Sequence, residues 1–462
     1  MFRILTYWMV KLIYDKGTIL IDEWIPQLHD LLKWDQRVKA FRAFAVDYFR
    51  IKSVLEGSNI EFEDYVLEPI EGSISLRREY RLRGYQEEAL KAWLNSKCRG
   101  IIVLPTGTGK TIVGIHAIAK VNSSSLIIAP TIELIYQWRD RLIEAFNVDI
   151  GIYGGGEKKL SFITVSTYDS AYLNAEYFGN KFKLIVFDEV HHLVSEGYRQ
   201  IAELNAAPFR LGLTATPERE DGKHVDLPLL VGNVVYSKRV KELTGSFLSP
   251  FRIVRIPVEL TSIEKEKYNE LTSIYKGFLK SRGLKIRSLN DFQKLILRSG
   301  LDNEARQALL AWHESRIVAL NAEGKIKVLK DILAKHRGEK IIVFTEYNDV
   351  VHRISRELLI PEITHKTISE ERERTLRMFR DGVFNIIATS KVLEEGIDVP
   401  DASIAIIISG TGSRREFIQR LGRILRPKNG KQAILYEIVT KGTLEARSSR
   451  KRRKALEPSS EV

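Results

Sequence analysis

A glycine-rich stretch, Leu104-Pro-Thr-Gly-Thr-Gly-Lys-Thr111, has the residue types that can hold phosphate groups. Its backbone N–H groups can turn toward an anion, Lys110 can reach the terminal phosphates of a nucleotide, and the Thr111 hydroxyl can hold Mg²⁺. The residues expected to contact the nucleotide are Thr106, Gly107, Thr108, Gly109, Lys110 and Thr111. A strict phosphate-binding loop has Gly where this chain has Leu104, so this stretch alone leaves an ordinary glycine-rich turn as the alternative.

A second group, Asp188, Glu189 and His191, follows the apolar run Leu184-Ile-Val-Phe187. Nucleotide hydrolysis needs a carboxylate that holds Mg²⁺ through water, and a group that orients and deprotonates the attacking water. We assign the first role to Asp188 and the second to Glu189. His191 has no second metal ligand at the i+4 position, so we expect it to act as a hydrogen-bonding relay between sites.

These side chains require a scaffold that brings the ends of several strands together. From Arg81 onward, short apolar runs alternate with helical segments such as Thr111–Lys120, which indicates parallel sheets. The strands expected in the first α/β domain are Gly100–Leu104, Ser125–Ala129, Phe162–Val165, Leu184–Phe187 and Leu211–Thr214. After Glu339 the pattern restarts, with strands expected at Ile341–Phe344, Thr364–Ile368, Asn385–Ala388, Ile404–Ile408 and Ala433–Ile438. We therefore expect two α/β domains in tandem, and only the first has a phosphate-binding loop.

Residues 1–77 are expected to form a small mixed domain. Trp8–Tyr14 and Thr18–Ile21 flank a turn and predict a hairpin, whereas Gln36–Ser53 has helical spacing. Residues 56–71 then contain six acidic side chains and no basic one. A solvated acidic loop is the expectation for this stretch, and a docking face for a basic protein is the alternative.

The charge composition of the chain indicates which class of binding partner to expect. With 72 Lys and Arg against 59 Asp and Glu, the chain carries a net charge of +13. Residues 1–80 hold 11 basic and 13 acidic side chains, so the positive charge belongs to the later domains and favours a polyanionic partner there. A single cysteine, Cys98, excludes an internal disulfide, and nine scattered His residues predict no structural metal cluster. No run approaches the roughly 20 apolar residues of a membrane span.

Residues 261–320 are expected to be helical and contain a strongly basic segment. Between Lys276 and Arg298, seven basic residues accompany one acidic residue, with Phe278 and Phe292 interleaved. A solvated helical face and a nucleic-acid contact are both open interpretations. The residues that would make the contact are Lys280, Arg282, Lys285 and Arg287. The basic tail at 447–454 either adds phosphate affinity or only keeps the chain soluble.

The order of the motifs along the chain resembles that of superfamily 2 helicases. These motifs are Gln86, the loop ending at Thr111, Asp188-Glu-Val-His191, Thr214-Ala-Thr216 and Gln419-Arg-Leu-Gly-Arg-Ile-Leu-Arg426. The match runs from about residue 81 to 440, and members of this superfamily often lack the first Gly of the loop. The resemblance implies ATP and Mg²⁺ as cofactors. It also implies two RecA-like motor domains, at 78–245 and 246–462, with a helical thumb at about 261–320 in the second.

The resemblance also implies roles for residues in both motor domains. Arg83 and Gln86 would read the adenine, and His191, Thr214 and Thr216 would couple the ATP state to the nucleic acid. In the second domain, the catalytic residues would be Gln419 and the arginine fingers Arg423 and Arg426, while Gly396 and Asp398 would sense nucleotide and strand. Contacts to DNA phosphates would come from Thr131, Thr167, Thr345 and Thr389, each of which is otherwise explained as a turn residue or a helix cap.

A finer resemblance is to the XPB-type branch, because Arg219-Glu220-Asp221 is similar to the RED motif of those proteins. It implies a 3′–5′ DNA helicase of DNA repair (nucleotide excision repair) or promoter opening, contacting DNA at this triplet and paired with a structure-specific nuclease. It also implies a damage-recognition domain at 1–77 and a cytoplasmic, nucleoid-associated prokaryotic protein. The acidic balance of residues 1–80 instead favours protein docking for that domain. Two alternatives stay open: a DNA-stimulated ATPase that positions a nuclease with little unwinding, and an RNA helicase.

Overall fold

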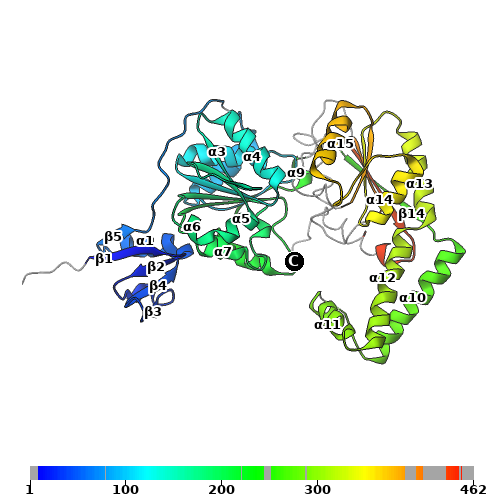
Figure 1. Ribbon diagram of the computed structural model, residues 1–462, viewed down its shortest axis with the longest axis horizontal. Coiled ribbons are helices and arrows are strands. Elements are labelled where there is room, and N and C mark those ends of the chain that lie inside the picture. Colours follow the sequence, from blue (N-terminus) through cyan, green and yellow to red (C-terminus); the bar gives the residue numbers. More distant parts are fainter. Residues whose placement is uncertain are drawn as a thin grey trace, which may run out of the picture. The chain divides into compact units, whose positions relative to one another are not determined.

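The computed structural model describes residues 9–78, 80–219, 221–243, 251–286, 289–390, 402–408, 433–446 and 449. The chain divides into two compact units, Met1–Arg239 and Val240–Val462, each considered below by itself (Figure 1). No helix in the described ranges has the length and apolar character needed to cross a bilayer.

The first unit opens with a small mixed sheet in the strand order β3-β4-β2-β1-β5. Its strands are β1 (Val10–Asp15), β2 (Thr18–Ile21), β3 (Lys33–Asp35), β4 (Ala40–Phe44) and β5 (Phe62–Tyr65). Between the strands lie η1 (Pro26–Leu28), η2 (Ala45–Asp47) and α1 (Tyr48–Gly57). The predicted hairpin is confirmed as β1 and β2, which pair antiparallel.

Two expectations for this domain were wrong. The helical spacing of 36–53 conceals strand β4, which pairs antiparallel with β2 and places Phe41 opposite Ile21, so α-helix begins only at Tyr48. Tertiary pairing here overrides local spacing. The acidic stretch is also more than a loop, because it contains β5, which pairs in parallel with β1 at the edge of the sheet.

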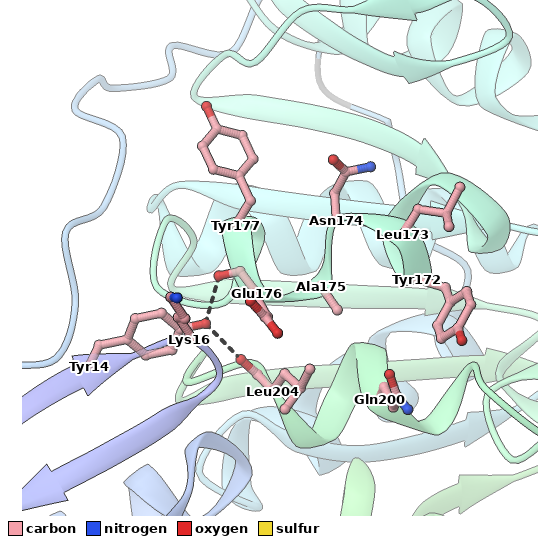
Figure 2. Close-up of a pocket in the computed structure, with 10 residues that line it drawn as sticks. All are labelled: Tyr14, Lys16, Tyr172, Leu173, Asn174, Ala175, Glu176, Tyr177, Gln200 and Leu204. Atoms are coloured by element: carbon pink, nitrogen blue, oxygen red, sulfur yellow. Dashed lines mark hydrogen bonds between the residues drawn. The ribbon is translucent and has the colours of Figure 1, made fainter. Parts of the chain in front are cut away.

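The small sheet is anchored to the domain that follows it. Figure 2 shows Tyr14 of β1, whose hydroxyl donates hydrogen bonds to the carbonyls of Glu176 (2.8 Å) and Leu204 (3.0 Å). A Cβ on Gly17 would lie 2.6 Å from the Leu204 side chain, so this close approach needs glycine. Burial raises the pKa of the Tyr14 hydroxyl well above its ordinary value, which keeps it a donor. A hollow of about 660 Å³ lies beside this contact, and none of the predicted site residues lines it.

The first α/β domain is built on a sheet with the order β13-β6-β12-β11-β7-β10-β8-β9, in which only β9 runs antiparallel to its neighbour. Its strands are β6 (Arg99–Val103), β7 (Ser125–Ala129), β8 (Ile150–Gly154), β9 (Glu157–Lys158), β10 (Ile163–Thr167), β11 (Leu184–Asp188), β12 (Phe209–Thr214) and β13 (Val234–Ser237). The five predicted strands are confirmed within two residues at each end, whereas β8, β9 and β13 were not predicted.

Helices cover both faces of this sheet, with α3 and α4 on one face and α5 to α7 on the other (Figure 1). The helical segments are α2 (Gly84–Asn95), α3 (Lys110–Val121), α4 (Ile132–Ala145), α5 (Tyr168–Leu173), α6 (Ala175–Phe178), η3 (Val190–His192), α7 (Arg199–Glu203), η4 (Lys223–Asp226) and α8 (Leu227–Leu230). Strands buried on both sides explain why the predicted runs were almost continuously apolar.

The second unit contains another parallel sheet, in the order β14-β19-β18-β15-β17-β16. Its strands are β14 (Phe251–Val258), β15 (Ile341–Phe344), β16 (Glu362–Ile363), β17 (Ile386–Thr389), β18 (Ile404–Ile407) and β19 (Ala433–Thr440). Helices α9 (Val240–Leu243), α13 (Glu323–Lys335), α14 (Asn348–Leu358) and α15 (Ser369–Asp381) also belong to this unit. The strand predicted at 364–368 was wrong: the Thr364 N–H donates to the Thr367 hydroxyl and the Thr367 N–H to the Thr364 carbonyl, closing a turn instead.

The segment expected to be helical, at about 261–320, contains α10 (Ser262–Ser281), α11 (Leu289–Ser299) and α12 (Asn303–Leu320) of the second unit, and it is called the thumb below. A capping box begins α10, in which Thr261 and Glu264 each bond the other's backbone N–H. The interleaved aromatic residues belong to the thumb's own packing. Phe278 is buried with Leu295, and the Phe292 ring centroid lies 4.7 Å from that of Trp312. Phe278 is therefore explained by core packing, and the choice between a solvated face and a nucleic-acid contact rests on the basic residues.

Candidate active site

Three adjacent parallel strands bring the predicted chemical residues to one edge of the first sheet. The glycine-rich loop follows β6, Thr214 ends β12 and Asp188 ends β11, and these strands are neighbours in the order β6-β12-β11. The carboxyl ends of parallel strands form the ligand-binding edge of such sheets. Residues that are distant in the sequence therefore meet at this edge.

The glycine-rich loop has the backbone geometry of an anion cradle. Gly107 and Gly109 have φ of 82° and 81°, which favours glycine. A Cβ on Gly109 would lie 2.6 Å from Gln86 Nε2, so a side chain at this position would collide with the glutamine that supports the loop. α3 begins at Lys110 and points its N-terminal N–H groups into the loop, and within the described part of the chain the buried Thr106 hydroxyl has no hydrogen-bond partner. This geometry fits a phosphate ligand.

Gln86 is buried against the same loop. Its Nε2 donates to the Thr108 carbonyl at 2.9 Å, and its Oε1 accepts from the Arg83 N–H at 2.8 Å. The hydroxyl of Tyr85, which was not predicted, donates to the same Thr108 carbonyl at 2.7 Å. The adenine-reading residues proposed from the sequence, Arg83 and Gln86, therefore start the helix that supports the phosphate loop.

Asp188 is a buried carboxylate that neighbouring donors hold in place. Its Oδ1 accepts from the Glu189 N–H at 3.0 Å, and its Oδ2 accepts from Trp138 Nε1 at 2.8 Å. Burial raises the pKa of Asp188 to about 6; the charge of Glu189 adds to the increase and that of Lys110 opposes it. The carboxylate of Asp188 and the hydroxyl of Thr111 are the oxygen donors that Mg²⁺ prefers, and a few protein ligands beside phosphate suffice for this ion.

Lys110 and Glu189 form an ion pair across the site. Lys110 Nζ lies 3.3 Å from Glu189 Oε1, and both side chains are largely buried. Glu189 has a φ of 49°, an unusual conformation for a residue other than glycine. The lysine expected to bind phosphate therefore contacts the carboxylate expected to activate water.

Thr214 connects the motif at the end of β11 with the motif at the end of β12. Its Oγ1 lies 3.1 Å from His191 Nδ1, donates to Glu189 Oε2 at 3.3 Å and accepts from the Thr216 N–H at 3.2 Å. His191 is fully buried, which suits a relay better than an exposed metal ligand. In the described ranges, no group of three or more His, Cys, Asp or Glu residues is arranged to hold a metal ion.

The triplet that begins at Arg219 also contacts this network. Arg219 Nη1 donates to the His191 carbonyl at 2.9 Å, and Nη2 donates to Asp221 Oδ2 at 2.8 Å. The hydrogen bond from Arg219 lowers the pKa of Asp221 to about 2. From the sequence we expected these residues to contact DNA, but no sequence feature indicated the hydrogen bond from Arg219 to the His191 carbonyl.

The four threonines expected near DNA all lie at strand ends. Thr131 caps α4 by accepting from the Leu134 N–H, and Thr167 caps α5 by accepting from the Ser170 N–H. Thr345 follows β15 and Thr389 ends the neighbouring β17 of the second sheet, and the Thr345 N–H donates to the Thr389 carbonyl at 3.0 Å. Their assignment to DNA contact stays a prediction.

In the thumb, Lys280, Arg282 and Lys285 are exposed, and Arg282 pairs with Glu304 at 2.8 Å. Several predicted residues lie outside the described ranges: Glu220, Arg287, Gly396, Asp398, Gln419, Arg423 and Arg426.

Two further residues of the site, besides Tyr85, were not found from the sequence. Trp138 has the spacing of a core residue on an amphipathic helix, with Ile135 and Leu142, so its pattern gives no hint that its N–H reaches Asp188. Tyr168 is likewise buried, and its hydroxyl donates to the Asp188 carbonyl at 3.0 Å.

Comparison with protein families identifies three matching segments. Residues 12–66 match the Xeroderma pigmentosum group B helicase damage recognition domain, residues 79–219 match the Type III restriction enzyme res subunit, and residues 313–457 match the ERCC3/RAD25/XPB C-terminal helicase. The solved structure of the Pyrococcus furiosus Hef helicase domain has a similar fold, with a TM-score of 0.55 at 21% identity over 80% of this chain and 98% of that one.

Individual relatives agree with these matches. The chain is 50% identical over 445 residues to the DNA 3′-5′ translocase XPB2 of Sulfurisphaera tokodaii, covering 96% of this chain and 100% of that protein. It is 33% identical over 399 residues to the DNA 3′-5′ helicase XPB of Mycobacterium tuberculosis, covering 83% of this chain and 65% of that protein. The resemblance and the α/β class with tandem RecA-like sheets are thereby confirmed. The chain belongs to the XPB-type family of superfamily 2 helicases.

Proposed function

We propose that this chain hydrolyses ATP at the carboxyl edge of β6, β12 and β11 and uses that energy to move 3′ to 5′ along DNA. Membership of the XPB-type family makes it an ATP-dependent DNA translocase or helicase, and its superfamily 2 domain implies nucleotide binding. The observation that supports this location is the meeting of Lys110, Asp188 and Glu189, with Lys110 Nζ 3.3 Å from Glu189 Oε1.

The ion pair suggests how binding prepares the reaction. Phosphates entering the loop offer Lys110 a more highly charged partner than Glu189. Once Lys110 turns to them, the Glu189 carboxylate loses its ion pair with this lysine and can accept a proton from the attacking water. Mg²⁺, held by Thr111 and Asp188, would neutralise phosphate charge. The loop amides from Thr106 to Gly109 orient the phosphates.

Thr214 is positioned to respond when Lys110 separates from Glu189. Its hydroxyl contacts both Glu189 and His191, and the His191 carbonyl accepts from Arg219. A movement of Glu189 would therefore alter the hydrogen bonds of Thr214 and Thr216 and reach the triplet at 219–221. We assign to this chain of contacts the coupling of ATP state to DNA.

The second motor domain supplies the remaining parts of the proposal. Arg423 and Arg426 would stabilise charge on the transferred phosphoryl group, which is typically worth about 10³–10⁵ in rate, with Gln419 beside them. Gly396 and Asp398 would sense nucleotide and strand. The domain boundaries proposed from the sequence, 1–77, 78–245 and 246–462, are part of this proposal.

DNA is the proposed track and the damage recognition domain one of its contacts. Further proposed contacts are Thr131, Thr167, Arg219, Glu220, Asp221, Lys280, Arg282, Lys285, Arg287, Thr345 and Thr389. The finer proposals are a role in nucleotide excision repair or promoter opening, a structure-specific nuclease as partner, and a cytoplasmic location beside nucleoid DNA.

The test compares ATP hydrolysis by the wild type and by Lys110→Ala on single-stranded, forked and bubble DNA, with RNA strands of matched sequence. We expect DNA stimulation in the wild type and a loss of at least about 100-fold in the variant, because a charged transition-state contact is removed. Hydrolysis by Lys110→Ala at the wild-type rate would refute the site. Stronger stimulation by RNA would favour the RNA helicase, and stimulation without strand separation would favour the ATPase that positions a nuclease.

A further inference from the structure

Two buried aromatic side chains donate hydrogen bonds to Asp188. Trp138 Nε1 reaches the carboxylate Oδ2 at 2.8 Å, and the Tyr168 hydroxyl reaches the backbone carbonyl at 3.0 Å. Trp138 belongs to α4 and Tyr168 to α5, which cover opposite faces of the sheet (Figure 1). The end of β11 is therefore held from both sides.

The indole of Trp138 has little freedom to move. Its side chain is 1% exposed, and a Cβ placed on Gly114 of α3 would lie 2.6 Å from its ring. The same Cβ would lie 3.3 Å from Leu213 of β12. Because the ring is confined between α3, β12 and α4, the position of its N–H follows the position of α4.

The same two helices begin at residues expected to contact DNA. Thr131 caps α4 about two turns before Trp138, and Thr167 caps α5 directly before Tyr168. A phosphate bound at the N-terminus of α4, a helix of 14 residues, would act on the element that carries Trp138. Trp138 of α4 contacts the Asp188 carboxylate proposed to hold Mg²⁺, and Tyr168 of α5 contacts the backbone carbonyl of the same residue.

We propose that Trp138 and Tyr168 are positioning residues that set the place of Asp188 and pass DNA contact at Thr131 and Thr167 to the metal-binding step. The inference rests on the proposed function, because the DNA contacts at the two caps and the role of Asp188 belong to it. Neither aromatic residue touches the nucleotide in this scheme; both act through Asp188.

The first experiment uses Trp138→Phe, which keeps an aromatic ring and removes the N–H donor. Trp93→Phe is the matched control, since Trp93 is fully buried and its Nε1 donates to the Arg210 carbonyl at 2.9 Å, away from Asp188. A fluorescent non-hydrolysable ATP analogue is titrated in EDTA and across a Mg²⁺ series. Loss of an outer partner of a metal ligand typically costs 10–100-fold in metal affinity, so we expect Trp138→Phe to raise the half-saturating Mg²⁺ concentration about tenfold. Binding in EDTA should be unchanged in both variants.

The second experiment uses Tyr168→Phe, which removes one hydroxyl and keeps the packing. Its control is Tyr48→Phe, because the buried Tyr48 hydroxyl donates to Asp64 at 2.6 Å within the N-terminal domain. We expect Tyr168→Phe to lower the ratio of DNA-stimulated to DNA-free ATP hydrolysis several-fold while DNA affinity without nucleotide stays constant. The Tyr48→Phe variant should keep the wild-type ratio.

Equal Mg²⁺ shifts in Trp138→Phe and Trp93→Phe would overturn the inference, because a general loosening of the core would then explain both. An unchanged Mg²⁺ dependence in Trp138→Phe would also overturn it, as would an unchanged stimulation ratio in Tyr168→Phe. A wild-type protein without DNA-stimulated hydrolysis would instead refute the proposed function and the DNA half of the inference. The Mg²⁺ titration would still decide the role of Trp138.

Discussion

The buried carboxylate of Asp188 makes the stability of the nucleotide-free protein depend on pH in a predictable direction. Burial raises its pKa from 3.8 to about 6, so between these values the folded protein binds a proton that the unfolded chain does not. The stability associated with the protonated group is fully present below pH 3.8 and is lost as the pH rises through 6. Asp188→Asn removes the titrating group and should escape this loss.

The size of the effect follows from the two pKa values. A difference of about two pKa units corresponds to about 3 kcal/mol over the full range, of which about 2 kcal/mol falls between about pH 4.5 and 7.5. The amide must also place its NH₂ against one of the two donors, Glu189 N–H or Trp138 N–H, which costs about 1–3 kcal/mol. That cost does not vary with pH. The prediction is therefore a slope: the stability of Asp188→Asn relative to the wild type rises by about 2 kcal/mol across this range.

The assay is denaturant unfolding in EDTA without nucleotide, followed from about pH 4.5 to 7.5. Asp221→Asn is the control, because Arg219 lowers the pKa of Asp221 to about 2. The stability that Asp221 contributes is present above pH 3.8 and is lost only as the pH falls through 2, so this variant should differ from the wild type by a nearly constant amount. A flat or falling difference for Asp188→Asn would refute the reasoning that burial dominates at this carboxylate.

Three further predictions concern other parts of the chain. Lys325→Met should destabilise the second unit by about 3–5 kcal/mol in denaturant unfolding, because Lys325 Nζ lies 2.8 Å from the buried Glu445 carboxylate. Adding Glu445→Leu should recover most of that loss, and failure to do so would argue against an uncompensated charge as the cause. Gly114→Ala should cost about 1–3 kcal/mol by thermal unfolding, because its Cβ would lie 2.6 Å from the Trp138 ring; an unchanged midpoint would show that the ring can move. The third change neutralises four thumb residues together: Lys280, Arg282, Lys285 and Arg287. DNA binding measured against salt should then weaken, and on single strands its logarithmic slope should flatten by about 0.7 for each phosphate that the variant no longer neutralises, whereas an unchanged slope would leave this segment as a solvated face.

The sequence predicted strands most accurately where both faces of the strand are buried. Strands such as Ser125–Ala129 are buried on both faces, so their apolar runs stand out without knowledge of their neighbours. Strand β4 was missed because it lies in a half-exposed sheet, where its pairing with β2 is decided by residues about 20 positions away. The turn at Thr364 was missed because its hydrogen bonds use threonine side chains, which read as strand residues in a propensity argument.

The active-site residues show a similar limit, because the motif residues were predictable from the sequence and the donors around them were not. A motif reports residue types and spacing along one strand and one loop, and these predicted that Lys110, Asp188 and Thr214 belong to one site. It does not report which donors surround a carboxylate, because Trp138 and Tyr168 come from helices whose spacing is that of ordinary core residues. Only the packing of α4 and α5 on the sheet brings these donors to Asp188.

The strand order explains how the charged groups of the site can be paired and yet change partners when phosphate binds. β12 lies between the strand of the phosphate loop and the strand of the carboxylates, so Thr214 sits where Glu189 and His191 both reach it. Lys110 and Glu189 are paired with each other in this structure, so both proposed chemical roles require the pair to separate. Phosphate binding would separate them and change the partner of Thr214 in the same step. A sheet with β6 and β11 adjacent would bring the same charges together, but it would leave no residue between them to sense the exchange.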